Sequence, residues 1–497
     1  MPFYLVWSSG RKNHRKTKND AFNGILNQGA VFSREEEIGV QKICRTPRIL
    51  FSATGSGCGK TTVSAAILAA LCQRGLHVQS MKSGPDYIDP MFHTRITGRA
   101  AYHADPFFST AEQMRELAAN VSGNADLLWI EGAMGFYDGI GQTSDASTYT
   151  TAMALQAPTL LLLQPQGMGR SVAAVCKGFL ELEQPNPIRG ILLNRVRSGM
   201  YAYYREILER ETGIPVCGYL PELPEVHLES RHLGLLLADE VTQLDEKIRL
   251  LGETAAQTID LDGILALAAE APSFSYPAAE SKPSPSFRLG IAQDRAFCFY
   301  YAENLDLLQS FGAELVPFSP IHDTKLPDDL DGIYLGGGYP ELHLKELSHN
   351  QSFLHDLRCH AASGIPIFAE CGGFLYLQQE LCDADGQAYP MAQLLDGTAR
   401  MGKRLCRFGY VTLTAQQDTL LGPAGTKIRA HEFHYADSTE NGDAFLVTRP
   451  NGRTWQAYQS HGNILGGFPH LYFPSNPKVP ANFAVKCRQF REEKKRL

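Results

Sequence analysis

Short apolar runs alternate with segments of helical periodicity in the first half of the chain, and this alternation predicts a parallel sheet. Arg48 to Thr54 and His77 to Ser83 are predicted as buried strands, and the Ala- and Leu-rich segment from Lys60 to Arg74 as a helix. Strands that are apolar along their whole length are typical of parallel sheets covered by helices on both faces. We therefore expect an α/β domain over residues 47–270. Its further strands are predicted at 127–130, 159–163 and 190–196.

The second half shows the same alternation after an interruption. Residues 271–286 are rich in Pro, Ser and Ala and lack periodicity, so a linker is expected there. A second α/β domain is expected over 287–480, followed by a charged tail over 481–497. The fold class predicted is therefore α/β with two domains, each a mostly parallel sheet covered by helices. The strands expected in the second domain are 289–292, 314–318, 332–335 and 365–368.

The first 46 residues fit neither domain. Apolar residues 1–7 precede a basic cluster that begins at Arg11, which is the reverse of the order in a signal peptide. We expect a disordered extension or a start codon set too early, with a basic anchoring arm as the alternative.

Composition narrows the class of protein. Over 497 residues the formal charge is −7 and the charged content 20%, so no field suited to a nucleic-acid backbone is expected. The longest apolar runs, such as 158–163, are too short to cross a bilayer. None of the eleven cysteines forms a CxxC pair, which favours reduced thiols in the cytoplasm over disulfides or a zinc site. The oligomeric state, monomer or homodimer, stays open.

A glycine-rich segment between the first strand and the first helix predicts a phosphate-binding loop. Glycines there let backbone N–H groups turn toward phosphate oxygens at a helix N-terminus, with Lys60 reaching the β- and γ-phosphates. Thr54 stands where the first glycine of the common motif falls, and a structural glycine turn is the alternative. The candidate nucleotide-binding residues are Gly55, Gly57, Gly59, Lys60, Thr61 and Thr62.

Two acidic residues follow strands of the same domain and complete a candidate magnesium site. Asp86 follows the second strand and Glu131 ends another, so both fall at the carboxyl edge of the sheet, where ligands gather. Together with the Thr61 hydroxyl they offer the oxygen donors that Mg²⁺ prefers. The alternative is that each acid caps a turn or pairs with a nearby base.

The second domain contains a candidate nucleophile. An apolar strand runs into Cys371, which two glycines and a helix follow, and this is the pattern of a nucleophile elbow. The helix N-terminus is expected to favour a thiolate. Backbone N–H groups of Gly337, Gly338 and Gly372 are candidates for an oxyanion hole, with a tight turn as the alternative for the upstream glycine run.

A cysteine nucleophile requires a base from elsewhere in the chain. From the residues alone four histidines remain open, with His470 slightly favoured because it follows a Gly pair near the end of the domain. The candidates are His431, His434, His461 and His470.

Several motifs together resemble a known family over residues 47–475. The first domain is similar to the synthetase domain of cobyrinate a,c-diamide synthases, which resembles dethiobiotin synthetase in fold. The second is similar to the class I glutamine amidotransferase domain of the same branch. The motifs that carry the resemblance are TGSGCGKTT, KSGPDYID, IEGAMGFYDG, ILLNRV, GGGYPELH, ECGGFLYL, MGKRLCRFGY and HEFHY.

The resemblance implies residue roles. Asn194 would read the adenine edge, and Tyr87 and Asp138 would line the substrate site. His470 would take the position of the base. Most class I glutaminases place a Glu two residues after this His, where the chain has Tyr472, so a Cys–His dyad is implied. Thr61, Asp86 and Glu131 would bind Mg²⁺, and Lys60 and Thr61 the triphosphate of ATP.

The implied activity is the ATP- and glutamine-dependent amidation of the a- and c-acetate carboxylates of cobyrinate in cobalamin biosynthesis. The same reaction on hydrogenobyrinate or nickel-sirohydrochlorin remains open, as does the order of the two amidations. The segment with Asp138 argues against a cobyric acid synthase. An alternative of another class is a nucleotide-dependent binding or regulatory protein with an inactive glutaminase domain.

Overall fold

The computed structural model describes residues 41–226, 230–231, 234–235, 240–277 and 283–496. Residues 41–497 form one compact unit. The predicted extension falls outside the described residues, apart from its last six positions. No helix in the described ranges is long and apolar enough to span a membrane.

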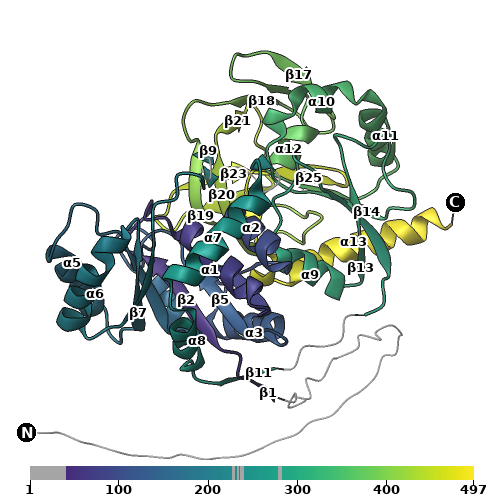
Figure 1. Ribbon diagram of the computed structural model, residues 1–497. Helices are drawn as coiled ribbons and strands as arrows, with labels where there is room; N and C mark the ends of the chain where they lie inside the picture. The colour runs from purple at the N-terminus through teal and green to yellow at the C-terminus, as the bar shows by residue number, and fades with distance from the viewer. Residues whose placement is uncertain (1–40, 227–229, 232–233, 236–239, 278–282, 497) are drawn as a thin grey trace, which may run out of the picture. The chain divides into compact units, whose positions relative to one another are not determined.

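The first half of the unit is built on a sheet of seven parallel strands, of which Figure 1 labels β2, β5 and β7. The strands predicted from apolar runs are confirmed, and β4 and β8 extend the sheet at its two edges. From edge to edge the order is β4 (Tyr102–His103), β3 (Val78–Lys82), β5 (Leu127–Glu131), β2 (Arg48–Ala53), β6 (Thr159–Leu163), β7 (Ile188–Asn194) and β8 (Val216–Leu220).

Helices cover both faces of this sheet because neighbouring strand residues point to opposite faces. Phe51 packs with α1 (Lys60–Gln73), α7 (Leu244–Thr258) and α8 (Leu261–Ala269). Leu50 packs into the opposite core, to which four other helices contribute. These are α3 (Ala111–Ser122), α4 (Thr148–Leu155), α5 (Ser171–Glu181) and α6 (Ser198–Thr212), while α2 (Ile88–Thr97) contacts α1.

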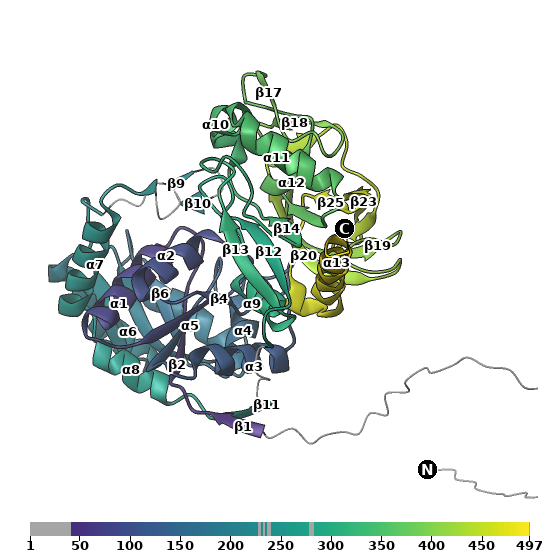
Figure 2. The ribbon, with the colours of Figure 1, turned by 90° about the vertical axis from the view of Figure 1, so that its right-hand side faces the viewer.

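The second half contains a six-stranded sheet that is parallel except at β24, and Figure 2 shows β12 and β13 side by side. Its order is β13 (Ala313–Phe318), β12 (Phe287–Ala292), β14 (Gly332–Leu335), β15 (Ile367–Glu370), β25 (Ile464–Gly467) and β24 (Gln459–His461). Its helices are α9 (Ala302–Ser310), α10 (Leu344–His349), α11 (Gln351–Ala362), α12 (Gly372–Leu377) and α13 (Lys478–Lys494), with 3-10 turns η2 (Pro340–Leu342) and η3 (Phe473–Ser475).

Two further sheets in this half are not foreseen by the alternation of strands and helices. A five-stranded antiparallel sheet has the order β23 (Thr454–Ala457), β22 (Phe445–Thr448), β19 (Arg407–Ala415), β20 (Lys427–His434) and β26 (His470–Leu471). A four-stranded sheet has the order β17 (Ala388–Pro390), β16 (Glu380–Cys382), β18 (Thr398–Met401) and β21 (Ala436–Ser438). In the first half, a small antiparallel pair joins β9 (Ser230–Arg231) to β10 (Gly234–Leu235). The two-domain α/β class is confirmed, with these antiparallel additions.

Two predicted segments differ from expectation. The linker over 271–286 contains β11 (Phe274–Pro277), which pairs antiparallel with β1 (Gln41–Cys44), inside the expected extension. The expected charged tail is the end of α13. Apolar side chains at helical spacing, Phe483, Ala484 and Cys487, are buried along this helix, so residues 481–494 pack on the core while their charged neighbours face outward.

Glu370, at the end of β15, connects three strands. Its side chain accepts a hydrogen bond from the Leu471 amide at 2.7 Å and another from the Tyr334 hydroxyl at 2.7 Å. Burial raises the pKa of Glu370 to about 8, against the opposing effect of these two hydrogen bonds. The carboxyl therefore holds its proton in the folded state at pH values where the unfolded chain has lost it.

We expect Glu370→Gln to gain stability relative to the wild type as pH rises from about 4.5 to about 8. In this window the unfolded wild type binds fewer protons than the folded protein, so wild-type stability falls, whereas glutamine does not titrate. Urea unfolding at pH 5 and pH 8.5 measures the difference. The exposed Glu181 supplies a control, because Glu181→Gln should show no such trend. A pH-independent difference for Glu370→Gln would contradict the assignment.

Candidate active site

The glycine-rich loop lies between β2 and α1, as predicted. Gly59 caps α1 in a left-handed conformation with φ 86°, and a Cβ atom there would lie 2.2 Å from Nδ2 of Asn194. Lys60 donates to the carbonyl of Gly55 at 3.1 Å and to that of Met134. The lysine ammonium thus bonds loop carbonyls that a bound phosphate would replace as partners.

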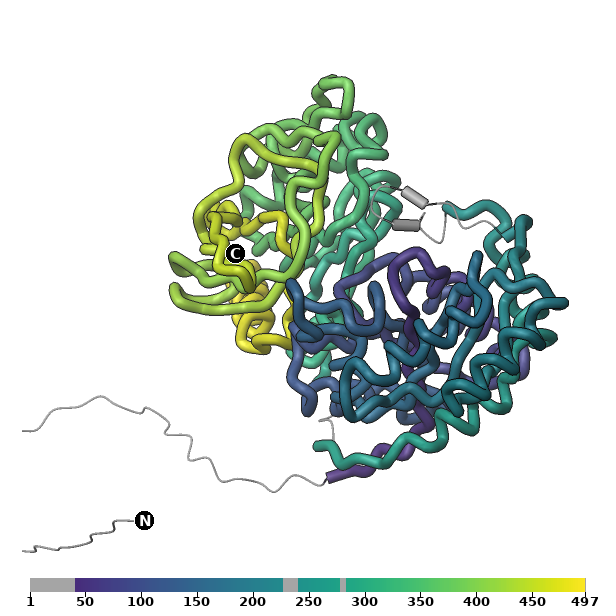
Figure 3. Tube along the Cα trace, turned by 90° about the vertical axis from the view of Figure 1, so that its left-hand side faces the viewer, coloured from purple at the N-terminus to yellow at the C-terminus, as the bar shows by residue number. Residues whose placement is uncertain are grey.

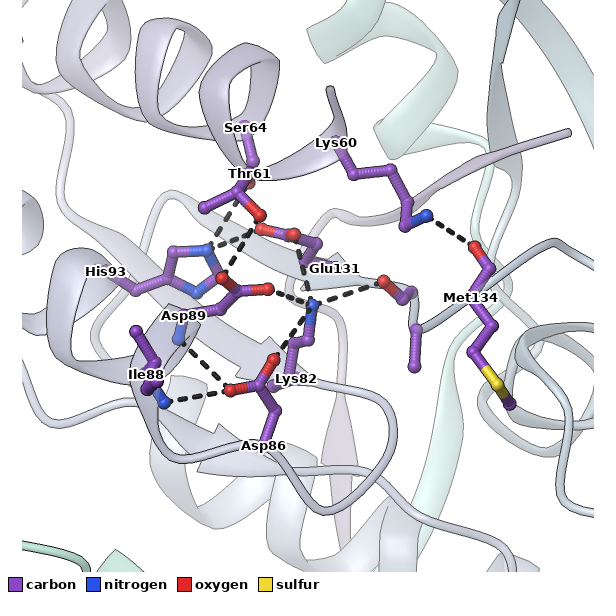
Figure 4. A network of polar contacts seen from close by, with 12 residues as sticks. Lys60, Thr61, Ser64, Lys82, Asp86, Ile88, Asp89, His93, Glu131 and Met134 are labelled. Carbon is purple, nitrogen blue, oxygen red and sulfur yellow. Dashed lines mark hydrogen bonds and ion pairs between the residues drawn. The ribbon is translucent and has the colours of Figure 1, made fainter. Parts of the chain in front are cut away.

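A buried cation lies at the carboxyl edge of the sheet, next to this loop (Figure 4). Lys82, at the end of β3, is 2% exposed, and its Nζ lies 2.5 Å from Oδ2 of Asp89, 3.1 Å from Oε1 of Glu131 and 3.9 Å from Oδ2 of Asp86. Thr61 donates to Oδ1 of Asp89 at 3.0 Å. The structure therefore brings the three predicted magnesium ligands into one network.

The charges of this network depend on one another. Burial alone would lower the pKa of Lys82, but the carboxylates of Asp89 and Glu131 outweigh it and raise that pKa. Burial opposes ionisation of Glu131 as well, but the charge of Lys82 and the 2.7 Å hydrogen bond between Nε2 of His93 and Oε2 of Glu131 lower the pKa of Glu131 below its ordinary value. The carboxylate of Glu131 is therefore ionised over the physiological pH range.

The donors around Lys82 suit a hard cation. They are a hydroxyl and carboxylates, the oxygen set that Mg²⁺ takes, and they already surround a positive charge. Within the described ranges, no three His, Cys, Asp or Glu side chains form a ready metal cage.

The remaining predicted residues of the first half take two different positions. Asn194 lies behind the glycine-rich loop and donates to the Cys58 carbonyl at 2.8 Å, so it supports the loop. Asp138 accepts from the Gly135 amide at 2.8 Å. Asp138 and Tyr87 both line a large cavity that Cys371 and His470 also line. Asn194 does not line it.

Cys371 occupies the predicted elbow between β15 and α12. Its backbone has φ 47°, which is uncommon for a residue with a side chain and typical of strained functional turns. The side chain is 8% exposed. Burial, with a further contribution from Glu341, raises the pKa of Cys371, so the expected thiolate is not favoured by this environment.

His470 lies beside this elbow, on the short strand β26. Its ring centroid is 5.1 Å from that of Tyr87, and a Cβ atom at Gly337 would lie 2.3 Å from its Cε1. Within the described ranges its Nδ1 is buried without a hydrogen-bond partner. Burial, with His431 and His434, lowers the pKa of His470 to about 3, so the imidazole is neutral. Packing, rather than a carboxylate, orients this ring.

The other three histidines separate clearly. His431 is the cross-strand partner of His470 and lines the same cavity. His434 is structural, since it contacts Glu432 at 2.9 Å and the Ala436 carbonyl at 2.5 Å. His461 is 46% exposed in its side chain and faces Asp396 at 3.6 Å.

The predicted oxyanion glycines surround the elbow. A Cβ atom at Gly372 would lie 3.0 Å from the Gly338 amide nitrogen, so the three glycines permit a close approach of backbone. Gly372 begins α12, where N–H groups have no intrahelical acceptor. The carbonyl of Gly337 accepts from the amides of Cys298 and Phe299. This contact keeps the glycine loop beside Cys371.

The two candidate sites line one cavity. Its volume is about 910 Å³, near the upper limit of about 300–1,000 Å³ for small-molecule sites. Gly57, Thr61 and Asp86 line it from the first half, and Cys371 and His470 from the second.

Side-chain contacts hold the two halves together around this cavity, and Figure 3 shows the halves next to each other. Tyr410 donates to Oδ2 of Asp105 at 2.6 Å, and Tyr102 to Oδ2 of Asp306 at 2.7 Å. Tyr472, at the position of the missing Glu, stacks on Phe108 with ring centroids 4.7 Å apart. The residue two positions after His470 therefore packs between the two halves.

Lys82, Asp89 and His93 were not foreseen as parts of the site. Lys82 and Asp89 both stand in the KSGPDYID motif, at a strand end and at the start of α2, and a lysine that ends a buried strand beside two acids was the available signal. His93 follows Asp89 by four residues on the same helix face, a weaker signal.

Comparison with family models identifies both halves. Residues 49–236 match the CobQ/CobB/MinD/ParA nucleotide binding domain, and residues 288–478 match the CobB/CobQ-like glutamine amidotransferase domain.

Curated relatives match over nearly their whole length. Cobyrinate a,c-diamide synthase of Dehalococcoides mccartyi (strain CBDB1) is 38% identical over 89% of this chain and 99% of its own. The enzyme of that name from Salmonella typhimurium is 37% identical over 88% and 98%. Among solved structures, PurLQS from Thermotoga maritima covers 43% of this chain at 16% identity with a TM-score of 0.29, too low to carry an argument. The chain belongs to the cobyrinate a,c-diamide synthase family of glutamine-dependent ligases.

Proposed function

We propose that this protein amidates the a- and c-acetate carboxylates of cobyrinate, using ATP and ammonia released from glutamine. The observation that carries the proposal is the shared cavity, which Thr61 and Asp86 line beside the phosphate loop and which Cys371 and His470 line beside the elbow. The names of the relatives support the choice of cobyrinate.

In the glutaminase half, Sγ of Cys371 attacks the side-chain amide carbon of glutamine while His470 takes the thiol proton. The amides of Gly338 and Gly372 face the developing oxyanion. His470 returns the proton to the departing ammonia and then activates the water that hydrolyses the thioester. Burial lowers the pKa of His470, so its ring is neutral and has an unprotonated nitrogen, while the same burial opposes its protonation until glutamine binds.

In the synthetase half, an oxygen of the substrate carboxylate attacks the γ-phosphorus of ATP and ADP leaves. Ammonia then attacks the carbonyl carbon of the acyl phosphate, and inorganic phosphate leaves as the amide forms. Lys60 is placed to neutralise the transferring phosphoryl group. Thr61, Asp86, Asp89 and Glu131 would hold Mg²⁺, which when bound neutralises phosphate charge.

The substrate is tested by offering the purified protein cobyrinate, hydrogenobyrinate and nickel-sirohydrochlorin with ATP and glutamine. Mass spectrometry then counts the amides formed. The proposal expects two amides on cobyrinate and a lower rate on the other two compounds. Faster amidation of either alternative would replace the substrate and keep the reaction, whereas no amidation of any compound would contradict the function.

We expect Cys371→Ala to abolish amidation with glutamine and to retain amidation with free ammonia, because the synthetase half would still form the acyl phosphate. Lys60→Ala should lower amidation by about 10²- to 10³-fold with either nitrogen source, since both depend on phosphoryl transfer. If Cys371→Ala lost amidation with free ammonia as well as with glutamine, glutamine hydrolysis and carboxylate amidation would not be separate reactions at two sites.

We expect His470→Ala to lower glutamine hydrolysis by about 10²- to 10⁴-fold, the usual contribution of a general base. His461→Ala is the matched control, because its exposed ring lies outside the cavity, and glutamine hydrolysis should remain unchanged. His431→Ala separates the pair of neighbouring rings. If His431→Ala lost glutamine hydrolysis while His470→Ala kept it, the base would be His431 and the assignment of His470 would be wrong.

A further inference from the structure

The glutaminase half lends the shared cavity a wall of four rings. Phe408 and Tyr410 are two apart on β19, so they point to the same face, and Phe433 and His431 are their cross-strand partners on β20. All four line the cavity. Ring centroids are 5.1 Å apart for Phe408 and Phe433, and 6.1 Å for Tyr410 and His431. The ring planes are inclined by 75° and 71° in these two pairs, so the lining is aromatic but presents both faces and edges of the rings.

The outer end of this wall is uncovered. Phe408 lines the cavity and is 52% exposed, so a bound ligand can reach its ring. The glutamine reaction does not need it, because glutamine has no conjugated surface and reacts at Cys371. A conjugated ligand that enters the cavity would pack against the faces and edges of these rings, the contacts that aromatic groups favour.

The same wall carries positive charge. Arg449 lines the cavity, donates through Nη2 to the carbonyl of Phe408, and leaves Nε buried without a hydrogen-bond partner in the described ranges. Within the described residues, the cavity lining contributed by the glutaminase half contains no Asp or Glu, whereas Asp86, Asp89 and Asp138 line the opposite side. A ligand with several carboxylates would therefore bind Arg449, beside the rings of Phe408 and Phe433.

We propose that Phe408, Tyr410, His431 and Phe433 form the platform on which the conjugated macrocycle of a tetrapyrrole polycarboxylate lies, with Arg449 binding a peripheral carboxylate. The glutaminase half then completes the substrate site of the synthetase half. The reacting carboxylate points toward the phosphate loop while the platform holds the ring. This inference rests on the proposed function and adds a specificity surface to it.

Equilibrium binding of cobyrinate to the full chain, without ATP or glutamine, tests the platform. We expect Phe408→Ala to raise the Kd for cobyrinate by about 3- to 10-fold, because it removes one stacking partner. Phe408→Tyr should restore binding. Arg449→Gln should raise the same Kd by about 10-fold and Arg449→Lys by less. Tyr203→Ala, at a ring 44% exposed on α6 and outside the cavity, is the matched control and should bind as the wild type does.

The outcomes separate the inference from the function it rests on. Unchanged cobyrinate binding in both Phe408→Ala and Arg449→Gln, with amidation of cobyrinate continuing, would overturn the platform alone. A weaker Kd for MgADP with unchanged cobyrinate binding would assign the rings to adenine and overturn it as well. A wild-type protein that neither binds nor amidates any of the three tetrapyrroles would overturn the proposed function itself. Unfolding midpoints of each variant exclude a loss of fold as the cause.

Discussion

The buried ammonium of Lys82 is the interaction on which the arrangement of the first half depends. An ion taken from water is stable only while its partners stay in place, and removal of one partner of a buried pair costs about 3–5 kcal/mol. Lys82 therefore ties β3 to Glu131 on β5 and to Asp89 on α2. These ion pairs fix the ends of β3 and β5 and the start of α2 at the carboxyl edge of the sheet. The phosphate loop follows β2 at the same edge.

The second half meets this edge through side chains that also belong to its own chemistry. Tyr87 follows Asp86 in the chain, lies 5.1 Å from the ring of His470 and stacks on Phe299 at 5.1 Å. A residue of the synthetase half therefore packs on His470, the base that we propose for the glutaminase half. Most class I glutaminases orient the base with a carboxylate, whereas here the ring of His470 packs between Tyr87 and Gly337. Tyr472, at the position of that carboxylate, stacks on Phe108 of the other half.

The parallel strands and the elbow can be predicted from local sequence. The antiparallel strands and the side-chain networks cannot, for physical reasons. Apolar runs predict the parallel strands because burial on both faces leaves no polar alternation, and a strand that ends in Cys371 predicts the elbow. Continuous apolar runs do not reveal the antiparallel strands β19 and β20, because only every second residue is buried over Val411–Ala415 and over 427–430. The network around Lys82 and the ring wall at Phe408 arise from side chains that are distant in sequence, so no local pattern reveals them. The role of Glu370 is identified only by its neighbours in space.

One cavity lined by both sites is the central claim, and an isotope competition tests it most directly. The protein is given glutamine labelled with ¹⁵N in its side-chain amide, together with ATP, cobyrinate and an excess of unlabelled ammonium. The shared cavity predicts product amides that carry ¹⁵N in nearly full proportion, because ammonia passes between the sites before it mixes with solvent. Amides diluted to the isotopic composition of the bulk ammonium would show that ammonia leaves the protein, and would contradict the account.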